Sequence, residues 1–149
     1  MSESVKDRIQ EDVKAAMRAR DKARLSVLRM TTAAIKQREI DSRSELDDAG
    51  VLSVLDKMIK QRRESVDQYR SAGRQDLVDK ESFEIGVLEE YLPAPLSDAE
   101  LDALIAGALE QTGASSMKDM GAVMAHLRPQ VQGRADMSAV SARVKQRLS

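Results

Sequence analysis

Apolar residues recur along this chain at spacings of three and four, which is the period of an amphipathic helix. In residues 4–19, Val5, Ile9 and Val13 follow one another at four-residue intervals. Residues 22–43 are apolar on two sides, which is typical of a central helix. No segment alternates apolar and polar positions as a half-buried strand does, so the pattern predicts an all-α fold.

Helix start and stop signals place two further helices before a proline pair. An acidic turn at 45–48 precedes a long third helix, which Gly73 is expected to end. The fourth helix covers about 74–92 and counts Phe83 among its apolar positions. Pro93 and Pro95 forbid its continuation. The segment 93–96 is therefore the predicted domain boundary.

The remainder of the chain has its own helix signals. Ser97 and Glu100 form a capping box, and Gly113 ends the helix that they begin. The last two helices are bounded by capping residues and a proline: Ser115 or Ser116 at the start of the sixth, Pro129 at its end and Asp136 at the start of the seventh. We predict a bundle of about four helices in residues 1–92 and a different, three-helix bundle in residues 97–149.

Composition supports helices and excludes several kinds of site. Apolar residues make up 42% of the 149 positions but aromatic ones only 2%, so the cores must be built from aliphatic side chains and Met. The chain has no cysteine, which excludes disulfides, thiolate zinc sites and cysteine nucleophiles. No apolar run approaches the roughly 20 residues of a membrane span, and the first residues lack a secretory apolar region. These features predict a cytoplasmic protein that does not contact a membrane.

The residues that could carry chemistry have simpler explanations. The seven glycines are scattered singly, so no phosphate-binding loop is formed, and His126 has no metal-binding partner in sequence. Serine and lysine together serve amidase-type enzymes, yet helix capping accounts for Ser115 and Ser116 beside Lys118. The acidic pairs at 47–48 and 89–90 fit helix starts and solvated surface. We expect no catalytic centre, cofactor or metal.

A basic excess is confined to the last part of the chain. Residues 113–149 carry six basic and two acidic side chains, a local charge of +4, whereas the whole chain has 24 basic and 25 acidic residues. Arg143 and Arg147 are four apart and are expected to face outward, with Arg134 in the preceding loop. The candidate RNA-contacting residues are Lys118, Arg128, Arg134, Arg143, Lys145 and Arg147.

Basic helix faces and rows of methionine can bind a partner, or they can be ordinary solvated surface and core packing. A basic helical face is commonly only solvated, and the basic run at 60–63 is expected to be an ion-paired surface because acids accompany it. Met117, Met120 and Met124 lie at core spacing, so plain packing is expected there. No aromatic residue follows Gly113, so RNA contact would depend on charge and shape.

Several runs, in the same order along nearly the whole chain, resemble those of stand-alone proteins of the GatB/YqeY family. The runs are RLSVLRM at 24–30, QRR at 61–63, LEEYLP at 88–93, GASSMKDMG at 113–121, GRAD at 133–136 and the closing Val140, Val144 and Leu148.

The resemblance implies two different helical bundles and kinship with the tail of the B subunit of tRNA-dependent amidotransferase. That tail is thought to hold tRNA, while the catalytic, ATP-using core lies elsewhere. A label of carbon-nitrogen ligase with glutamine as amido-N-donor would thus be inherited from the larger enzyme. The implied partners are tRNA and an amidotransferase or aminoacyl-tRNA synthetase. The tail motif falls on Lys118, Gly121, Val123, Met124, Gly133, Arg134 and Ala135.

Two functions of different kinds follow from these observations. The first is a non-catalytic accessory module that contacts tRNA through its basic C-terminal bundle. The alternative is a helical protein-interaction module without RNA binding, which the balanced charge of the first ninety residues favours. An enzyme ranks third.

Overall fold

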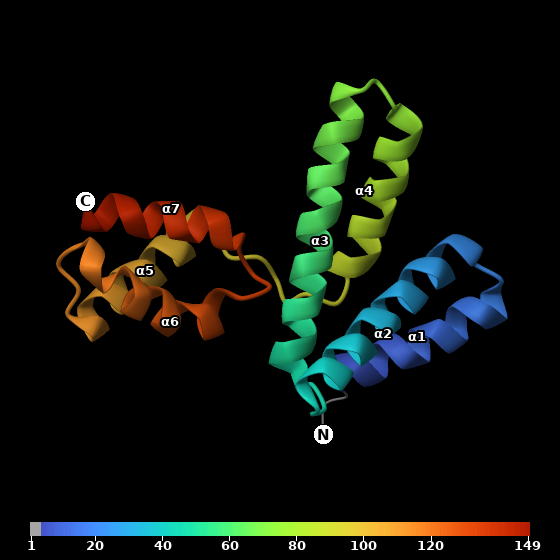
Figure 1. The fold of residues 1–149 in the computed structure, drawn as a ribbon, viewed down its shortest axis with the longest axis horizontal. Helices are drawn as coiled ribbons and strands as arrows, with labels where there is room; N and C mark the ends of the chain where they lie inside the picture. Colours follow the sequence, from blue (N-terminus) through green and yellow to red (C-terminus); the bar gives the residue numbers. More distant parts are fainter. Residues whose placement is uncertain (1–3) are drawn as a thin grey trace. The chain divides into compact units, whose positions relative to one another are not determined.

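A computed structural model describes residues 4–149, and Figure 1 shows the chain as a series of helices joined by short turns. No strand occurs within those residues, so the predicted all-α fold is confirmed. The helices are α1 (Val5–Ala19), α2 (Lys22–Ser42), α3 (Asp48–Ser71), α4 (Gln75–Glu89), α5 (Asp98–Thr112), the short 3-10 helix η1 (Met117–Asp119), α6 (Met120–Val131) and α7 (Met137–Leu148).

The chain divides into two compact units, Met1–Leu92 and Pro93–Ser149, and each has a hydrophobic core of its own. The first core draws on α1 to α4 and the second on α5 to α7. Over residues 4–149, every helix is too short or too polar to cross a bilayer.

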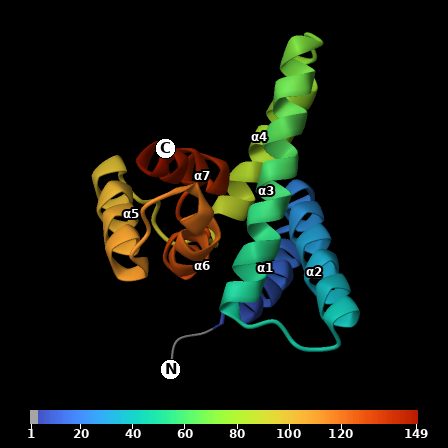
Figure 2. The same cartoon turned by 60° about the vertical axis from the view of Figure 1, so that its left-hand side comes forward.

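The first unit consists of two antiparallel helical hairpins, α1–α2 and α3–α4 (Figures 1 and 2). Arg20, in the left-handed region with φ 57°, ends α1, and the carboxylate of Asp21 caps α2 by accepting the N–H of Arg24. Gly73 takes φ +71° directly after α3, which only glycine adopts readily, so its predicted role in ending the third helix is confirmed. Short turns therefore keep each pair of helices side by side.

The core of this unit lies where the hairpins meet. Its fully buried members include Ile9 of α1, Leu28 of α2, Leu55 of α3 and Leu88 of α4. Further out along the α3–α4 hairpin only Val66 and Val78 are buried, and both lie outside the core cluster. The outer half of this hairpin is thus a two-helix arm, and Figure 1 shows it extending beyond α1 and α2.

Two predicted features of the first unit are wrong. The second apolar side of α2 is not covered, since Met30 is 40% exposed, and burial is limited to one face that includes Val27, Leu28 and Ile35. Phe83 of α4 is 46% exposed, while its neighbour Glu84 is buried in its place. The core position on this turn is thus held by a charged residue, which hydrophobic periodicity alone could not indicate.

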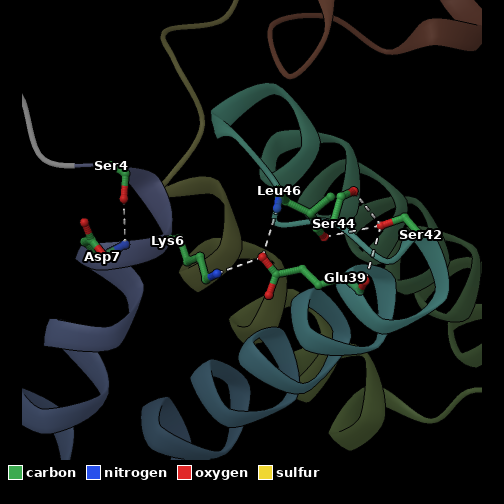
Figure 3. Close-up of polar contacts among 7 residues, drawn as sticks. All are labelled: Ser4, Lys6, Asp7, Glu39, Ser42, Ser44 and Leu46. Atoms are coloured by element: carbon green, nitrogen blue, oxygen red, sulfur yellow. Dashed lines mark hydrogen bonds and ion pairs between the residues drawn. The ribbon is translucent and has the colours of Figure 1, made fainter.

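A polar contact fastens α1 and α2 to the loop before α3 (Figure 3). The Lys6 ammonium lies 2.7 Å from Oε2 of Glu39, and the same oxygen accepts the N–H of Leu46 at 2.9 Å. Together these donors hold the pKa of Glu39 below its ordinary value. Asp48 adds a second tie by accepting the N–H of Val5 at 3.0 Å.

Two further polar contacts lie deeper in the first unit. Arg62 of α3 places Nη2 3.4 Å from Oε1 of Glu84, and both side chains are largely buried. Tyr91, which follows α4, donates its hydroxyl to Asp12 of α1 at 2.5 Å. Burial and this hydrogen bond raise the pKa of Tyr91 above its ordinary value. The segment after α4 is therefore joined to the middle of α1 by a buried phenol.

The second unit packs α5, α6 and α7 around a wholly apolar core. Its buried residues are Leu101, Ile105, Ala108, Val123, Leu127, Val131, Val140, Val144 and Leu148. The capping box predicted for α5 is confirmed, since the hydroxyl of Ser97 accepts the N–H of Glu100 and the carboxylate of Glu100 accepts the N–H of Ser97. Gly113, at φ +65°, ends α5 as predicted.

Two predictions for α6 are wrong. Pro129 does not close the helix, because α6 continues to Val131. Proline lacks the N–H that would bond to the carbonyl of Ala125 and its ring crowds that carbonyl, which is destabilising, but its fixed φ is compatible with a helix and α6 continues for two more residues. Met117 belongs to η1 and is 44% exposed, whereas Met120 and Met124 pack against the core as expected.

Candidate nucleic-acid interface

The six candidate cations come from every part of the second unit after α5. Lys118 lies on η1, Arg128 in the last turn of α6, Arg134 in the loop that follows, and Arg143, Lys145 and Arg147 on α7. They differ in what their side chains already contact. Two of them, Arg134 and Arg143, form contacts with other segments of the unit, and the other four are exposed.

Arg143 connects α7 to α5. Its Nη1 lies 2.8 Å from Asp102 and its Nη2 2.7 Å from Asp98, which are four residues apart on α5. The hydrogen bond to Asp102 and the charges of both aspartates raise the pKa of Arg143. The side chain is only 33% exposed. Arg143 therefore lies at the surface but is not free, and any phosphate would have to compete with two carboxylates.

Arg134 fixes the segment that enters the second unit. Its Nε donates to the carbonyl of Ala94 at 3.0 Å, and its own carbonyl accepts the N–H of Leu96 at 2.9 Å. Its charge also helps to lower the pKa of Glu100, after the hydrogen bonds from Ser97. Arg134 thus holds the segment before α5 in place, whether or not it contacts a ligand.

The other four cations are free within the described chain, residues 4–149. Lys118, Arg128, Lys145 and Arg147 are all exposed and form no ion pair there. Lys145 and Arg147 are two residues apart, which separates them by roughly 200° around α7. They therefore flank the buried stripe of the helix on opposite sides instead of forming one row.

Charge is segregated within the second unit. Its four acids before Gly113 are Asp98, Glu100, Asp102 and Glu110, on or at α5, while six of the eight charged residues from Gly113 onward are basic. The unit as a whole is neutral, with six acids and six bases. In the folded unit, the acidic helix α5 therefore packs with α6 and α7, which carry most of the basic residues.

The residues of the tail motif are mostly needed by the fold. Val123 is fully buried, and Met124 and Ala135 pack against the same core. Gly133 is buried with φ +77°, a conformation that favours glycine. Gly121 differs from these, because it is exposed on the first turn of α6 and a Cβ there would meet no atom within 4 Å. The fold does not explain this glycine.

The other sequence candidates have local structural roles. Ser115 and Ser116 donate their N–H groups to the carboxylate of Asp119 at 2.9 and 3.2 Å, which orders the start of η1, for which Ser116 is the N-cap residue. His126 is exposed on α6. Asp136 caps α7 through the N–H of Ser138, as predicted.

The acidic pairs serve helix ends and surface ion pairs, as expected. Asp47 caps α3, and Glu89 and Glu90 pair with Arg63 and Arg24. Across residues 4–149, no three His, Asp or Glu side chains gather closely enough to hold a metal ion.

Hydrophobic periodicity did not predict the arrangement around Arg62. The run at 60–63 was expected to be a solvated, ion-paired face, which holds for Arg63 and its partner Glu89. Arg62 instead turns inward to Glu84 and borders a cavity of about 520 Å³ in the first unit. The only available signal was that Glu84 occupies the same face of α4 as Val87 and Leu88.

Comparison with known proteins agrees with the family resemblance. The family model described as Yqey-like protein matches residues 6–148 of the chain. Similar proteins include two fungal ones, both named "Altered inheritance of mitochondria protein 41, mitochondrial".

The one from Eremothecium gossypii is 39% identical over 94 residues, covering 62% of this chain and 51% of that protein. The one from Pyrenophora tritici-repentis is 32% identical over 143 residues, covering 93% of this chain and 78% of that protein. The chain therefore spans about half the length of the first of these relatives and more of the second.

The expectation of a cytoplasmic protein is contradicted by these relatives, which are named as mitochondrial. The expectation depended on the lack of a secretory apolar region and of cysteine. Neither feature distinguishes a cytoplasmic from a mitochondrial protein, because mitochondrial targeting uses amphipathic, Arg-rich segments instead of an apolar one.

Proposed function

The chain belongs to the YqeY-like family, and from this premise we propose that it is a non-catalytic accessory module that contacts tRNA through its second unit. The observation that carries the proposal is the segregation of charge, with four exposed and unpaired cations on η1, α6 and α7 of the described chain. Such cations attract phosphates, and they do so without base recognition. The resemblance to the amidotransferase tail points to tRNA as the polyanion.

The contact would be made by charge and shape. No Phe, Tyr or Trp lies in the second unit, so the usual platforms for base stacking are absent there. Gly121 supports the proposal because it keeps the surface beside Lys118 free of a side chain, which allows a sugar-phosphate backbone to approach the helix closely. An amidotransferase or aminoacyl-tRNA synthetase that acts on the same tRNA would be the protein partner.

The main test is a titration of the full chain against total tRNA at two salt concentrations. Each phosphate contact contributes a log-log slope of about −0.7 to −0.9, so four contacts give a slope near −3. Reversing the four exposed cations, Lys118, Arg128, Lys145 and Arg147, to Glu should abolish binding and flatten this slope.

A matched control reverses four exposed cations of the first unit that form no ion pair in residues 4–149: Arg18, Lys36, Lys57 and Lys60. It makes the same change in net charge and should leave most of the affinity. If both variants lose binding equally, the attraction depends on total charge and the proposed site is wrong.

Gly121 offers a finer test. Replacement by Ala meets no steric obstacle and should leave the fold as stable or more stable, by up to about 1 kcal/mol, because glycine is a poor helix former. If RNA approaches the backbone here, Gly121→Ala lowers affinity for tRNA while melting is unchanged or raised. Unchanged affinity would remove Gly121 from the interface.

The non-catalytic part of the proposal is tested separately. The pure chain supplied with glutamine, ATP and mischarged tRNA should release no ammonia and form no amidated product. Turnover that persists in protein prepared from a different host would overturn it.

A second candidate function is a helical protein-interaction module without RNA binding. It is favoured by the cavity of the first unit, which has Met30 and Phe83 exposed in its lining. Absence of tRNA binding by the unmodified chain at low salt would give this function first place.

A further inference from the structure

Two adjoining cavities form a groove along α2 in the first unit. The larger, of about 520 Å³, is lined by α2, α3 and the middle of α4, and the smaller, of about 460 Å³, by α2 alone. Ser26 and Met30 line both, so the two cavities are neighbours along α2. The α2 wall runs from Lys22 to Ala33, a length of roughly 16 Å at the helical rise. That length matches about three turns of a second helix.

The middle of the groove is apolar but uncovered. Met30 and Phe83, two of the few large apolar side chains that are exposed in the described residues, lie in its lining. Methionine adapts its shape to different partners, and an exposed aromatic is a common anchor of binding surfaces. These two side chains are what a partner would cover.

The Arg62 side chain forms the polar part of the floor. Its Nη1 donates to the carbonyl of Met58 at 3.2 Å, and its Nη2 lies 3.4 Å from Glu84 and 3.8 Å from the sulfur of Met30. Its Nε is buried and has no acceptor within residues 4–149. The guanidinium thus holds an unused donor close to the apolar centre, where leaving it unsatisfied is costly.

The rim of the groove is positively charged. Lys22, Arg29 and Lys80 border it, against a single acid, Glu81, once the Arg62–Glu84 pair is set aside. An acidic partner is therefore favoured electrostatically. An RNA strand would also be attracted, but the groove places apolar side chains and one aromatic at its centre, which suits an apolar helix face better.

We propose that this groove binds an amphipathic helix of a partner protein, with its apolar face on Met30 and Phe83 and acidic residues along its flanks. The site lies entirely in the first unit and does not depend on RNA contact by the second. It would let the chain hold a protein partner and a polyanion at the same time through different units.

The test uses the full chain with 13C-methyl methionine and a synthetic 15-residue peptide. The peptide carries Leu at helical spacing i, i+3, i+4 and i+7 with Glu on both flanks. We expect a saturable shift of the Met30 methyl signal, which Met30→Leu identifies by its loss. A peptide of scrambled order and one with Lys for Glu should bind at least about tenfold more weakly, since they lose the apolar stripe or the charge match.

Phe83→Ala should weaken peptide binding by about tenfold or more. Ile40→Ala is the matched control, because Ile40 is 60% exposed on the same α2 but outside the groove, and it should change nothing. Both residues are exposed, so circular dichroism should show both variants folded.

Three outcomes would overturn the proposal. One is no saturable shift up to millimolar peptide, and another is equal binding of the scrambled peptide. The third is that Phe83→Ala lowers affinity for tRNA and not for peptide, which would make the groove a nucleic-acid site. The failure of RNA contact at the second unit would leave the peptide result untouched, so the two proposals are distinguishable.

Discussion

In the first unit charged side chains take part in the packing between helices, whereas the second unit has a core made only of aliphatic residues. Arg62 and Glu84 meet between α3 and α4 with side chains 14% and 7% exposed. In the second unit the one interhelical ion-pair contact in the described chain, Arg143 with two aspartates, stays at the surface. Both units therefore pack around a hydrophobic core, but only the first also holds a largely buried ion pair between its helices within the described residues.

The difference follows from geometry. Two hairpins that meet over part of their length leave long helix surfaces without a third neighbour, and polar ties there are better tolerated than in a closed core. Three short helices around one centre leave no such space. We therefore expect a cavity-forming substitution to lower the stability of the second unit more than that of the first. We expect substitutions of charged residues to change the stability of the first unit more than that of the second.

The largest expected effect is that of Leu127→Ala, which removes a fully buried side chain from the second core. Such a change costs about 2–5 kcal/mol, and a core of this size rarely supplies more than about 3–5 kcal/mol in total. We expect the second unit to unfold while the first stays folded. All three aromatic residues, Tyr69, Phe83 and Tyr91, lie in the first unit, so near-ultraviolet circular dichroism should persist while far-ultraviolet helicity falls.

Leu55→Ala is the matched change in the first core. It should weaken the near-ultraviolet signal or lower its melting temperature, and leave the helicity of the second unit in place. If Leu127→Ala removes both signals together, the units unfold as one and the comparison between two cores is wrong.

A smaller effect is expected from Glu84→Gln. The substitution keeps the shape but removes the charge that faces the buried Arg62, and we expect a loss of about 1–3 kcal/mol in the free energy of unfolding. Replacing both partners, as Arg62→Met with Glu84→Leu, should restore most of the loss because no buried charge is left unpaired. Denaturant unfolding measures both.

The exposed pair Arg63–Glu89 on the same two helices is the control. Glu89→Gln should cost less than about 1 kcal/mol, as is usual for surface ion pairs. Equal losses at Glu84 and Glu89 would show that burial of the Arg62 pair contributes nothing.

The smallest effect is a dependence on pH. Lys6 and the N–H of Leu46 lower the pKa of Glu39 in the folded chain. This contact therefore stabilises the first unit fully at pH values above 4.5, the ordinary pKa of a glutamate. The stabilisation is lost as pH falls through the lowered pKa, because the carboxylate then binds a proton. Glu39→Gln should therefore flatten the decrease in melting temperature of the first unit as the pH falls below 4.5.

Glu100→Gln provides the corresponding change in the second unit, where hydrogen bonds from Ser97 lower the pKa of Glu100. Glutamine can still accept the capping hydrogen bond, so only the dependence on pH should weaken. Far-ultraviolet melting, which includes the second unit, should change more than the aromatic signal. A change confined to the aromatic signal would contradict this assignment.

Much of the fold could be predicted from local signals. Gly73, Gly113, the Ser97–Glu100 box and Asp136 all end or begin helices as expected, because capping depends on a few neighbouring residues. The prediction that Pro129 ends α6 is wrong, because a helix can accommodate a proline near its C-terminal end and α6 continues to Val131. The structure divides the chain at the predicted proline pair, and independent folding of each unit remains a prediction that Leu127→Ala tests.

The candidate site could be predicted only as a list of residues. Sequence identified six cations but not that α5 supplies two aspartates to Arg143 or that Ala94 accepts from Arg134. These partners are about forty residues away along the chain, as the hydrogen bonds show. Similarly, Glu84 could not be matched to Arg62 without knowing how α3 and α4 pair.

By itself the sequence determined the helical class, most helix ends and the aliphatic nature of the cores, because hydrophobic period and capping act between residues a few positions apart. Only the tertiary structure decided which charges are free. Arg143, Arg134 and Arg62 are held by partners from other segments, while Lys118 and Arg147 reach solvent. The physical reason is that the contacts of a long charged side chain depend on which groups helix packing brings within a few ångströms. Those distances cannot be obtained from the order of residues alone.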